Sequence, residues 1–305
     1  MIAIEATGLM RRFPSASGGV QALDGLSFSV NEGELFGLVG PDGAGKTTAI
    51  RAVAGLLVPD SGSVAVLGRD PIKGGSEVRE SLGLMPQQYS LYGDLTVGEN
   101  LRFFGQLFCI PKAQFTERQR RLLHLTRLEP FVGRRADALS GGMYKKLALA
   151  CALLHEPKVL LLDEPTNGVD PVSRRELWEL LYEFVADGMA VLLSTPYMDE
   201  AERCHRVGLV HHGRLLALGK PSTLVREFDH EPFEITGGVR EEVDAVLRGL
   251  DSVRAISPAG ARLRVVLRPG TRAEVARALD PLGATLHVTR ADFEDLYLVR
   301  VSEAA

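Results

Sequence analysis

A glycine-rich segment, GPDGAGKT from Gly40 to Thr47, constrains the fold of this chain more than any other feature. It follows the apolar run ELFGLV and precedes KTTAIRAVAGLL, in which apolar residues recur at helical spacing. The pattern G-x-x-x-x-G-K-[ST] between a strand and a helix predicts a phosphate-binding loop. Glycine is required because backbone N–H groups must approach phosphate oxygens closely, and the helix N-terminus adds partial positive charge. We expect the phosphate contacts to come from Gly40, Pro41, Asp42, Gly43, Ala44, Gly45, Lys46, Thr47 and Thr48.

Two adjacent acids, Asp163 and Glu164, end a second apolar run, VLLLDEP. Carboxylates at the end of a buried strand are costly unless a cation or a catalytic task uses them. We therefore expect Lys46 to bind the β and γ phosphates of a nucleotide, and Thr47 to hold Mg²⁺. Asp163 would face the magnesium directly or through water, while Glu164 polarises the water that attacks the γ phosphate. The alternative is that the two acids form a helix cap and a surface ion pair.

The remaining pattern predicts an α/β fold. VLLLDEP and MAVLLST are continuous apolar runs, as expected of parallel strands buried on both faces, and SRRELWELLYEFVADG is the helix between them. Residues 1 to about 36 alternate strand-like runs with the turn-rich insert PSASGG, which predicts an antiparallel edge sheet. Residues from about 90 to 155 have amphipathic segments and no strand-like run, so we expect an inserted helical subdomain there.

The pattern of predicted strands and helices changes after about residue 228. The segments that follow predict the order βαββαβ, which suits a small α+β unit of the ferredoxin-like type. We therefore expect two domains, residues 1–228 and 229–305. The alternative for residues 229–305 is an irregular tail packed on the larger domain.

Composition limits the class of protein. The 305 residues carry a formal net charge of -4, with acidic and basic residues mixed along the chain, so a nonspecific nucleic-acid partner is disfavoured. Cys109, Cys151 and Cys204 lack metal-ligand or disulfide spacing, and we expect all three to be small core residues in a reducing compartment. Neither a membrane-spanning run nor a signal peptide is evident, so we expect a complete cytoplasmic chain that shares any membrane task with another subunit.

The stretch LSGGM distinguishes this chain from other phosphate-loop proteins. Ser140, Gly141 and Gly142 open the helix MYKKLALACALL, and their N–H groups and hydroxyl predict a second phosphate site. A phosphate loop, an LSGG helix start and an acidic strand end together resemble the nucleotide-binding domain of ATP-binding cassette (ABC) transporters over roughly residues 1 to 228. The resemblance implies a P-loop NTPase fold, with ATP and Mg²⁺ as cofactors. It also implies head-to-tail pairing with a second nucleotide-binding domain, so that each ATP lies between one phosphate loop and the partner's LSGG.

Three further residues match positions of this family. Phe13, in LMRRF, matches the aromatic that stacks on adenine, with a core phenylalanine as the alternative. Gln87, in GLMPQQYSLY, matches the glutamine that reaches magnesium and senses the transmembrane partner, although Gln88 beside it leaves the register open. Asp170, in NGVDP, matches the loop that crosses the dimer interface, and would serve equally well as a plain helix N-cap.

One position departs from the family pattern. Pro196, in LLSTPYMDEAERC, stands where family members carry a histidine that contacts the γ phosphate. Proline has neither a side-chain donor nor a backbone N–H, so our hypothesis is that ATP bound at this chain's own loop turns over slowly. An intact LSGG would still complete a site on a different partner, which favours a heterodimer. The alternative is a homodimer in which Thr195, Tyr197 or an ordered water fills the role.

The amino-acid sequence from SRRELW to MDEAERC and the closing run ADFEDLYL resemble those of the ATPases of bacterial drug and lipid exporters. That resemblance implies an integral membrane permease as partner and a peripheral place on the inner face of the cell membrane. Two rival classes stay open: a soluble ABC ATPase without a membrane partner, and a nucleotide-sensing module that hydrolyses almost nothing. Other histidines need no function, since His211 and His212 mark a hairpin and a charged His155 suits a helix end.

Overall fold

Three β-sheets organise the computed structural model, which describes residues 1–14, 18–88, 91–260 and 262–304. Part of the predicted PSASGG insert, residues 15–17, lies outside the described residues. The chain divides into two compact units. The first comprises Met1–Tyr197 with Cys204–Leu215, and the second comprises Met198–Arg203 with Leu216–Ala305.

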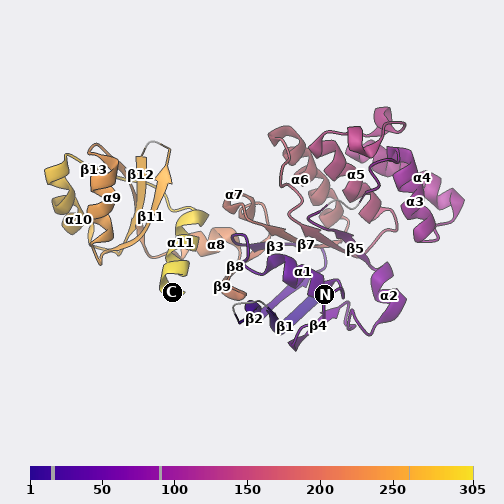
Figure 1. Ribbon diagram of the computed structural model, residues 1–305, viewed down its shortest axis with the longest axis horizontal. Coiled ribbons are helices and arrows are strands. Elements are labelled where there is room, and N and C mark those ends of the chain that lie inside the picture. Colours follow the sequence, from indigo (N-terminus) through magenta and orange to yellow (C-terminus); the bar gives the residue numbers. More distant parts are fainter. Residues whose placement is uncertain (15–17, 89–90, 261, 305) are drawn as a thin grey trace. The chain divides into compact units, whose positions relative to one another are not determined.

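The largest sheet has six strands, and all of it except the last four residues of β9 belongs to the first unit (Figure 1). β3 is parallel to both of its neighbours, β7 and β8, and β6 is parallel to β5 and β7. Every residue of β3, β6 and β7 is buried, which explains the continuous apolar runs in the sequence. In sheet order the strands are β5 (Leu82–Met85), β6 (Val159–Asp163), β7 (Ala190–Thr195), β3 (Leu35–Val39), β8 (Arg206–His211) and β9 (Arg214–Gly219).

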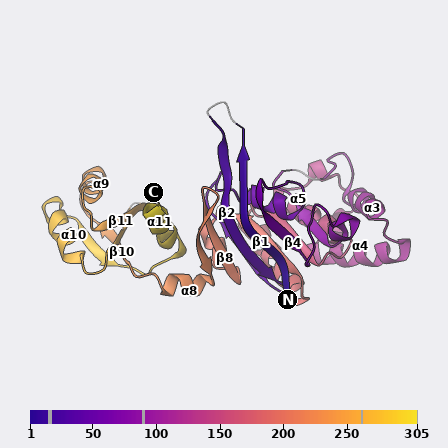
Figure 2. The ribbon, with the colours of Figure 1, turned by 90° about the horizontal axis from the view of Figure 1, so that it is seen from below.

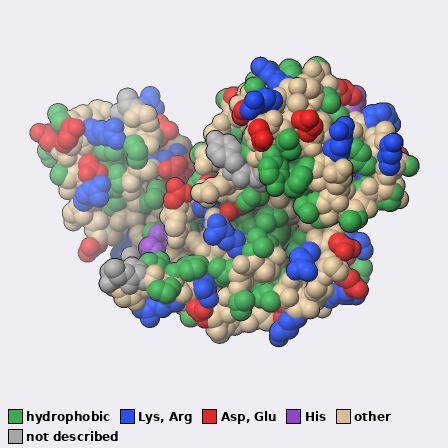
Figure 3. Space-filling view, turned by 45° about the vertical axis from the view of Figure 1, so that its right-hand side comes forward, with side chains coloured by type: hydrophobic (Ala, Val, Ile, Leu, Met, Phe, Trp, Pro, Cys, Tyr) green, Lys and Arg blue, Asp and Glu red, His purple; other side chains and the backbone are tan. Residues whose placement is uncertain are grey.

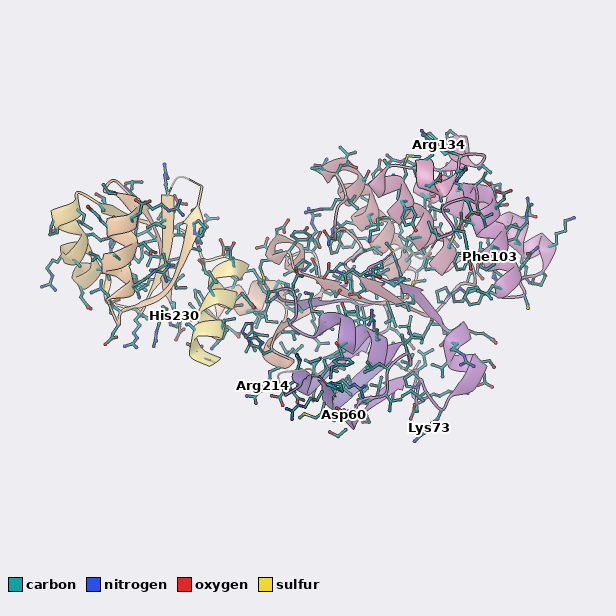
Figure 4. All side chains as sticks on the ribbon, viewed as in Figure 1. Asp60, Lys73, Phe103, Arg134, Arg214 and His230 are labelled. Atoms are coloured by element: carbon teal, nitrogen blue, oxygen red, sulfur yellow. The ribbon has the colours of Figure 1, made fainter. Side chains whose placement is uncertain are left out.

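A three-stranded antiparallel sheet lies beside the six-stranded one, with the order β2-β1-β4. It consists of β1 (Ile2–Phe13), β2 (Val20–Asn31) and β4 (Ser61–Val66). The predicted antiparallel pairing of β1 with β2 is confirmed, and Figure 2 shows them as two long strands side by side. Asp60, labelled in Figure 4, lies just before β4, and its carboxylate binds the guanidinium of Arg11 at 2.7 Å. Helix α1 (Lys46–Val53) packs between the two sheets, with Ala49 and Ile50 in their shared core.

The described chain between β5 and β6 is mostly helical from Val97 onward, in agreement with the helical segment expected at about 90 to 155. Within the described part of that segment the structure has no strand; it has α3 (Val97–Leu107), α4 (Lys112–Thr126), α5 (Gly141–Leu153) and two short 3₁₀ helices, Glu129–Phe131 and Ala136–Ala138. A capping box starts α3, because Thr96 accepts from the N–H of Glu99 while the Glu99 carboxylate accepts from the N–H of Thr96. The first unit also contains α2 (Gly75–Glu80) and α6 (Pro171–Ala186).

The second unit is built on a four-stranded antiparallel sheet with the order β11-β12-β10-β13. Its elements from β10 to β13 follow the order βαββαβ that the sequence predicts. A closing helix, α11, was not predicted; it contains the run FEDLYL. The elements are α7 (Met198–Ala201), α8 (Pro221–Arg226), β10 (Glu231–Thr236), α9 (Arg240–Arg248), β11 (Val253–Ala259), β12 (Arg262–Leu267), α10 (Arg272–Leu279), a 3₁₀ turn (Asp280–Leu282), β13 (Thr285–Val288) and α11 (Phe293–Ala304).

An ion pair fixes α11 to the sheet of the second unit. Arg264 on β12 donates from Nε and Nη2 to the two carboxylate oxygens of Asp295, at 2.7 and 2.6 Å. The pair is buried, since the side chains are 13% and 1% exposed. Asp292 and Asp295 each accept from the backbone N–H of the other, at 3.0 Å, so the start of α11 is also capped.

Two expectations from the sequence are wrong in detail. Cys151 and Cys204 are buried as predicted, but Cys109 is exposed, because it follows the end of α3 at the surface. Burial lowers the pKa of the His155 imidazole, which disfavours the charged ring expected at this helix end, and Nε2 lies 2.9 Å from the carbonyl oxygen of Leu82. The hairpin at His211 and His212 is present, since β8 and β9 are separated only by His212 and Gly213.

On the face in Figure 3, basic and acidic side chains are interspersed rather than separated by sign. Over the described residues, the structure contains no helix of the length and apolarity needed to span a membrane.

Candidate functional site

The phosphate loop connects β3 to α1 and is held closely by neighbouring backbone. The N–H of Gly40 donates to the carbonyl oxygen of Thr195 on β7 at 3.2 Å. A Cβ atom on Gly40 would lie 2.1 Å from the carbonyl oxygen of Val210, and one on Gly45 would lie 2.2 Å from that of Ala22. Gly45 also has a φ of +105°, a region that favours glycine. The glycines are therefore needed to let the loop pass between β8 and β2.

Lys46 begins α1 and directs its ammonium group into the loop. The side chain is only 3% exposed, and Nζ donates to the carbonyl oxygens of Gly40 at 2.7 Å and Pro41 at 2.9 Å. Burial lowers the pKa of Lys46, while the nearby carboxylates of Glu164, Asp42 and Asp163 oppose that shift. The ammonium group is therefore held in place by the backbone of the phosphate loop, in a position suited to a bound anion.

Asp163 ends β6 directly across from Ser194 on β7. Its Oδ1 accepts from the hydroxyl of Ser194 at 2.6 Å and from the hydroxyl of Thr47 at 3.0 Å. Neighbouring ligands of an octahedral Mg²⁺ ion, bound at 2.0–2.1 Å, lie about 2.9 Å apart. The hydroxyl of Thr47 and the carboxylate of Asp163 are hard oxygen donors at that spacing, so this pair of residues fits magnesium.

Glu164 follows Asp163 in an unusual backbone conformation, with a φ of +49°. Such a conformation is rare for a residue other than glycine and persists only where its surroundings enforce it. Its N–H donates to the hydroxyl of Ser194 at 3.1 Å. Its Oε2 accepts from Nε2 of Gln87 at 2.9 Å and from Nδ2 of Asn167 at 3.1 Å, while Oε1 lies 3.9 Å from Nζ of Lys46. The carboxylate is thereby held on both sides at the edge of the sheet.

A second group of predicted residues gathers at the starts of α5 and α6. Ser140 caps α5, accepting from the N–H of Met143 at 3.3 Å. A Cβ atom on Gly142 would lie 2.3 Å from the hydroxyl of Ser173, so a larger residue would push the two helix starts apart. Asp170 caps α6, and its pKa is lowered by the hydroxyl and N–H of Ser173. The N-cap alternative for Asp170 is thus present in the structure.

One predicted residue from each group lines a cavity of about 570 Å³. Among its lining residues are Gln87 from the first group, Gly141 from the second, and Lys145 and Asn167. Lys145 lies on α5 with Nζ 3.5 Å from the carbonyl oxygen of Glu164, and burial lowers the pKa of this lysine. The cavity therefore has walls that carry amide and ammonium donors.

Two predicted residues lie at the edges of these groups. Phe13 ends β1 opposite Val20 and is half-buried, with the guanidinium of Arg11 5.0 Å from its ring centre, so it is not a core phenylalanine. Pro196 directly follows β7, and Gln87, rather than Gln88, is the glutamine that contacts Glu164.

Sequence reasoning missed three residues of the site: Lys145, Asn167 and Ser194. Ser194 carried a signal, because it is a hydroxyl within the apolar run MAVLLST, on the strand expected beside VLLLD. The sequence gives no such signal for Lys145 or Asn167, because their contacts depend on how α5 and the loop after β6 fold back toward Glu164.

Comparisons with known proteins agree with this geometry. The family model described as "ABC transporter" matches residues 23–167, from β2 to Asn167. The Nod factor export ATP-binding protein I of Rhizobium sp. (strain N33) is 41% identical over 250 residues, which is 81% of this chain and 81% of that protein. The chain belongs to the ABC transporter family. The predicted family is therefore confirmed, and the cassette is of the ABC ATPase type.

Two further ABC proteins are similar to this chain. The probable multidrug ABC transporter ATP-binding protein YbhF of Escherichia coli (strain K12) is 43% identical over 299 residues, 97% of this chain and 51% of that protein. This chain thus spans about half the length of that relative. A solved structure described as the ATP-binding subunit of an ABC transporter is 32% identical, with a TM-score of 0.66, and the match covers 74% of this chain and 93% of the other. The predicted cassette fold is confirmed by this likeness.

Proposed function

We propose that this chain is the ATP-hydrolysing subunit of an ABC exporter. The observation that carries the proposal is the meeting of Lys46, Thr47, Asp163 and Glu164 at one edge of the six-stranded sheet, where a phosphate loop opens into a helix. Relatives named as multidrug and Nod factor export proteins support the export role.

The loop N–H groups and Lys46 would bind the β and γ phosphates of ATP. Thr47 and Asp163 would hold Mg²⁺, with the side-chain oxygen of Gln87 as a further ligand, and the bound ion would neutralise charge that develops on the phosphates. Glu164 would orient the attacking water and accept its proton. Gln87 and Asn167 both donate to Oε2 of that carboxylate, which leaves Oε1 on the side of Lys46 and the phosphates.

The second anion site, at Ser140, Gly141 and Gly142, would serve a second nucleotide-binding domain placed head to tail. Asp170 lies next to it, since its carboxylate is 3.2 Å from the Cβ position of Gly142. Phe13 would stack on the adenine ring, for which a half-buried aromatic at the end of β1 is suitable.

The helical subdomain would receive the permease on the cytoplasmic face of the membrane. Tyr92 and Phe103 form an edge-to-face pair with ring centres 4.6 Å apart, and Phe104 lies 5.4 Å from Phe103 (labelled in Figure 4). Tyr92 and Leu107 are 48% and 61% exposed. An exposed aromatic and aliphatic surface of this kind suits a short amphipathic helix from an integral membrane subunit.

A matched pair of variants tests the hydrolytic function. Lys46→Ala removes the buried cation and should abolish Mg²⁺-dependent ATP binding in a titration. Glu164→Gln keeps the size of the side chain, so it should preserve ATP binding but lower the ATPase rate at least about a hundredfold. Retained binding in Lys46→Ala would refute the assignment of the loop.

Pro196 favours slow turnover at this chain's own loop, because it offers no donor where a transferring phosphoryl group develops charge. If so, Pro196→His should raise the ATPase rate of the purified chain by about a hundredfold, and Pro196→Ala, which restores only the backbone N–H, should raise it far less. An unchanged ATPase rate in Pro196→His would contradict the hypothesis that Pro196 slows turnover. A rate near zero in the unaltered chain that rises only with a second cassette and a membrane subunit would favour a nucleotide-sensing partner in a heterodimer.

A further inference from the structure

The residue after Pro196 is fixed by a tight turn. The N–H of Tyr197 donates to the hydroxyl of Thr195 at 3.1 Å, and the carbonyl oxygen of Thr195 accepts from the N–H of Gly40. The turn is therefore tied to the first glycine of the phosphate loop. Its geometry sets where the side chain of Tyr197 emerges from the end of β7.

The ring of Tyr197 is held from one side by α6. The guanidinium carbon of Arg174 lies 4.9 Å from the centre of the ring, within the range of a cation–π contact. The phenolic hydroxyl then donates to Oδ1 of Asn167 at 3.3 Å. Tyr197 thus reaches from the switch position toward the loop that follows the acidic strand end.

Asn167 connects the phenol to the carboxylate proposed as catalytic. Its Nδ2 donates to Oε2 of Glu164 at 3.1 Å. An amide side chain presents an acceptor on one side and donors on the other, so a donor at Oδ1 selects the orientation in which Nδ2 faces Glu164. Rotation by half a turn would place two oxygens against each other at Glu164, and the phenolic oxygen of Tyr197 would have to accept from the amide instead of donating to it.

We propose that Tyr197 is a positioning residue for ATP hydrolysis, which holds Glu164 in place through Asn167. The proposal rests on the hydrolytic function proposed above. It gives a role to the segment in which proline stands at the position of the family's histidine: a donor is supplied one residue later, and it binds Asn167, which in turn contacts the carboxylate of Glu164. A tyrosine that serves only to pack against Arg174 would need its ring and not its hydroxyl.

Tyr197→Phe separates these two roles, because it keeps the ring over Arg174 and removes only the phenolic O–H. In the full-length chain we expect kcat for ATP hydrolysis to fall about fivefold, the effect of one neutral hydrogen bond, with KM for ATP unchanged. Tyr182→Phe, which removes the phenolic hydroxyl of a tyrosine on α6, is the matched control and should leave kcat unchanged. Thermal unfolding of both variants should match that of the parent chain.

A double-mutant cycle identifies the route through Asn167. Tyr197→Phe should have no effect on kcat in an Asn167→Ala background, because the connection to Glu164 is already broken. Equal kcat for Tyr197→Phe and the parent, or effects of the two substitutions that multiply, would overturn the positioning role while leaving the hydrolytic function intact. A parent chain without Mg²⁺-dependent hydrolysis would overturn both.

Discussion

Alanine substitutions at three glycines of the phosphate loop separate two reasons for needing glycine. Gly43 has a φ of +77° and open space around its Cβ position, so Gly43→Ala adds backbone strain alone. Gly40 has no positive φ but would place Cβ 2.1 Å from the carbonyl oxygen of Val210, so Gly40→Ala adds a clash alone. Gly45 combines a φ of +105° with a distance of 2.2 Å to the carbonyl oxygen of Ala22.

The geometry sets the size of each effect. A residue with a Cβ atom in the left-handed region costs about 1–2 kcal/mol, so Gly43→Ala should lower kcat/KM for ATP about tenfold. Ordinary contacts to a Cβ atom begin near 3.4 Å, so Gly40→Ala forces the loop or β8 to shift by about 1 Å, a displacement that costs about a hundredfold at a site for phosphoryl transfer. Gly45→Ala carries both costs, which amounts to about a thousandfold.

Steady-state ATPase measurements and Mg²⁺-ATP titrations on the three purified variants provide the comparison. Thermal unfolding serves as the control, because a loss of the whole fold would lower all three rates together. The expected order of kcat/KM is Gly43→Ala above Gly40→Ala above Gly45→Ala. If Gly43→Ala is as impaired as Gly40→Ala, close approach to Val210 is not what requires glycine, and the reasoning fails.

Two further predictions concern stability. Asp295→Ala leaves Arg264 partly buried without its bidentate partner, so the free energy of unfolding of the second unit should fall by about 3 kcal/mol in denaturant titration. Asp244→Ala, which breaks an exposed ion pair to Arg248, should change that free energy little. Equal effects would contradict the burial argument. His155 has a folded-state pKa below its ordinary value of 6.5, so the unfolded chain binds more protons below about pH 6.5 and the free energy of unfolding should fall as the pH drops from there through the folded-state pKa. His155→Gln should flatten that slope in unfolding curves recorded at several pH values; an unchanged slope would assign it to other groups.

The central sheet and the phosphate loop were predictable because their signals are local. VLLLD and AVLLST are buried at every position, and a strand covered on both faces needs apolar side chains throughout. The loop pattern depends on glycine conformations that few other sequences require.

Other elements were not predictable because distant partners create them. β4 is mostly exposed or half-buried, so its sequence SGSVAV lacks the alternation of a typical strand, and pairing with β1 defines it. The final helix α11 depends on Arg264, 31 residues before Asp295, for the ion pair at its start. Within the site, the contact of Asn167 with Glu164 follows from a turn of the chain and not from any motif.

The path of the chain between the two units limits how they can be taken apart. Met198–Arg203 belongs to the second unit although Tyr197 and Cys204, on either side of it, belong to the first. Its helix α7 contacts α11, the last element of the chain. A truncation after Leu215 would therefore leave α7 behind without the helix that covers it, one residue from Tyr197. A deletion mutant of this kind would report on a damaged hydrolysis site as well as on a missing domain, and a loss of ATPase activity in it would say nothing by itself about regulation.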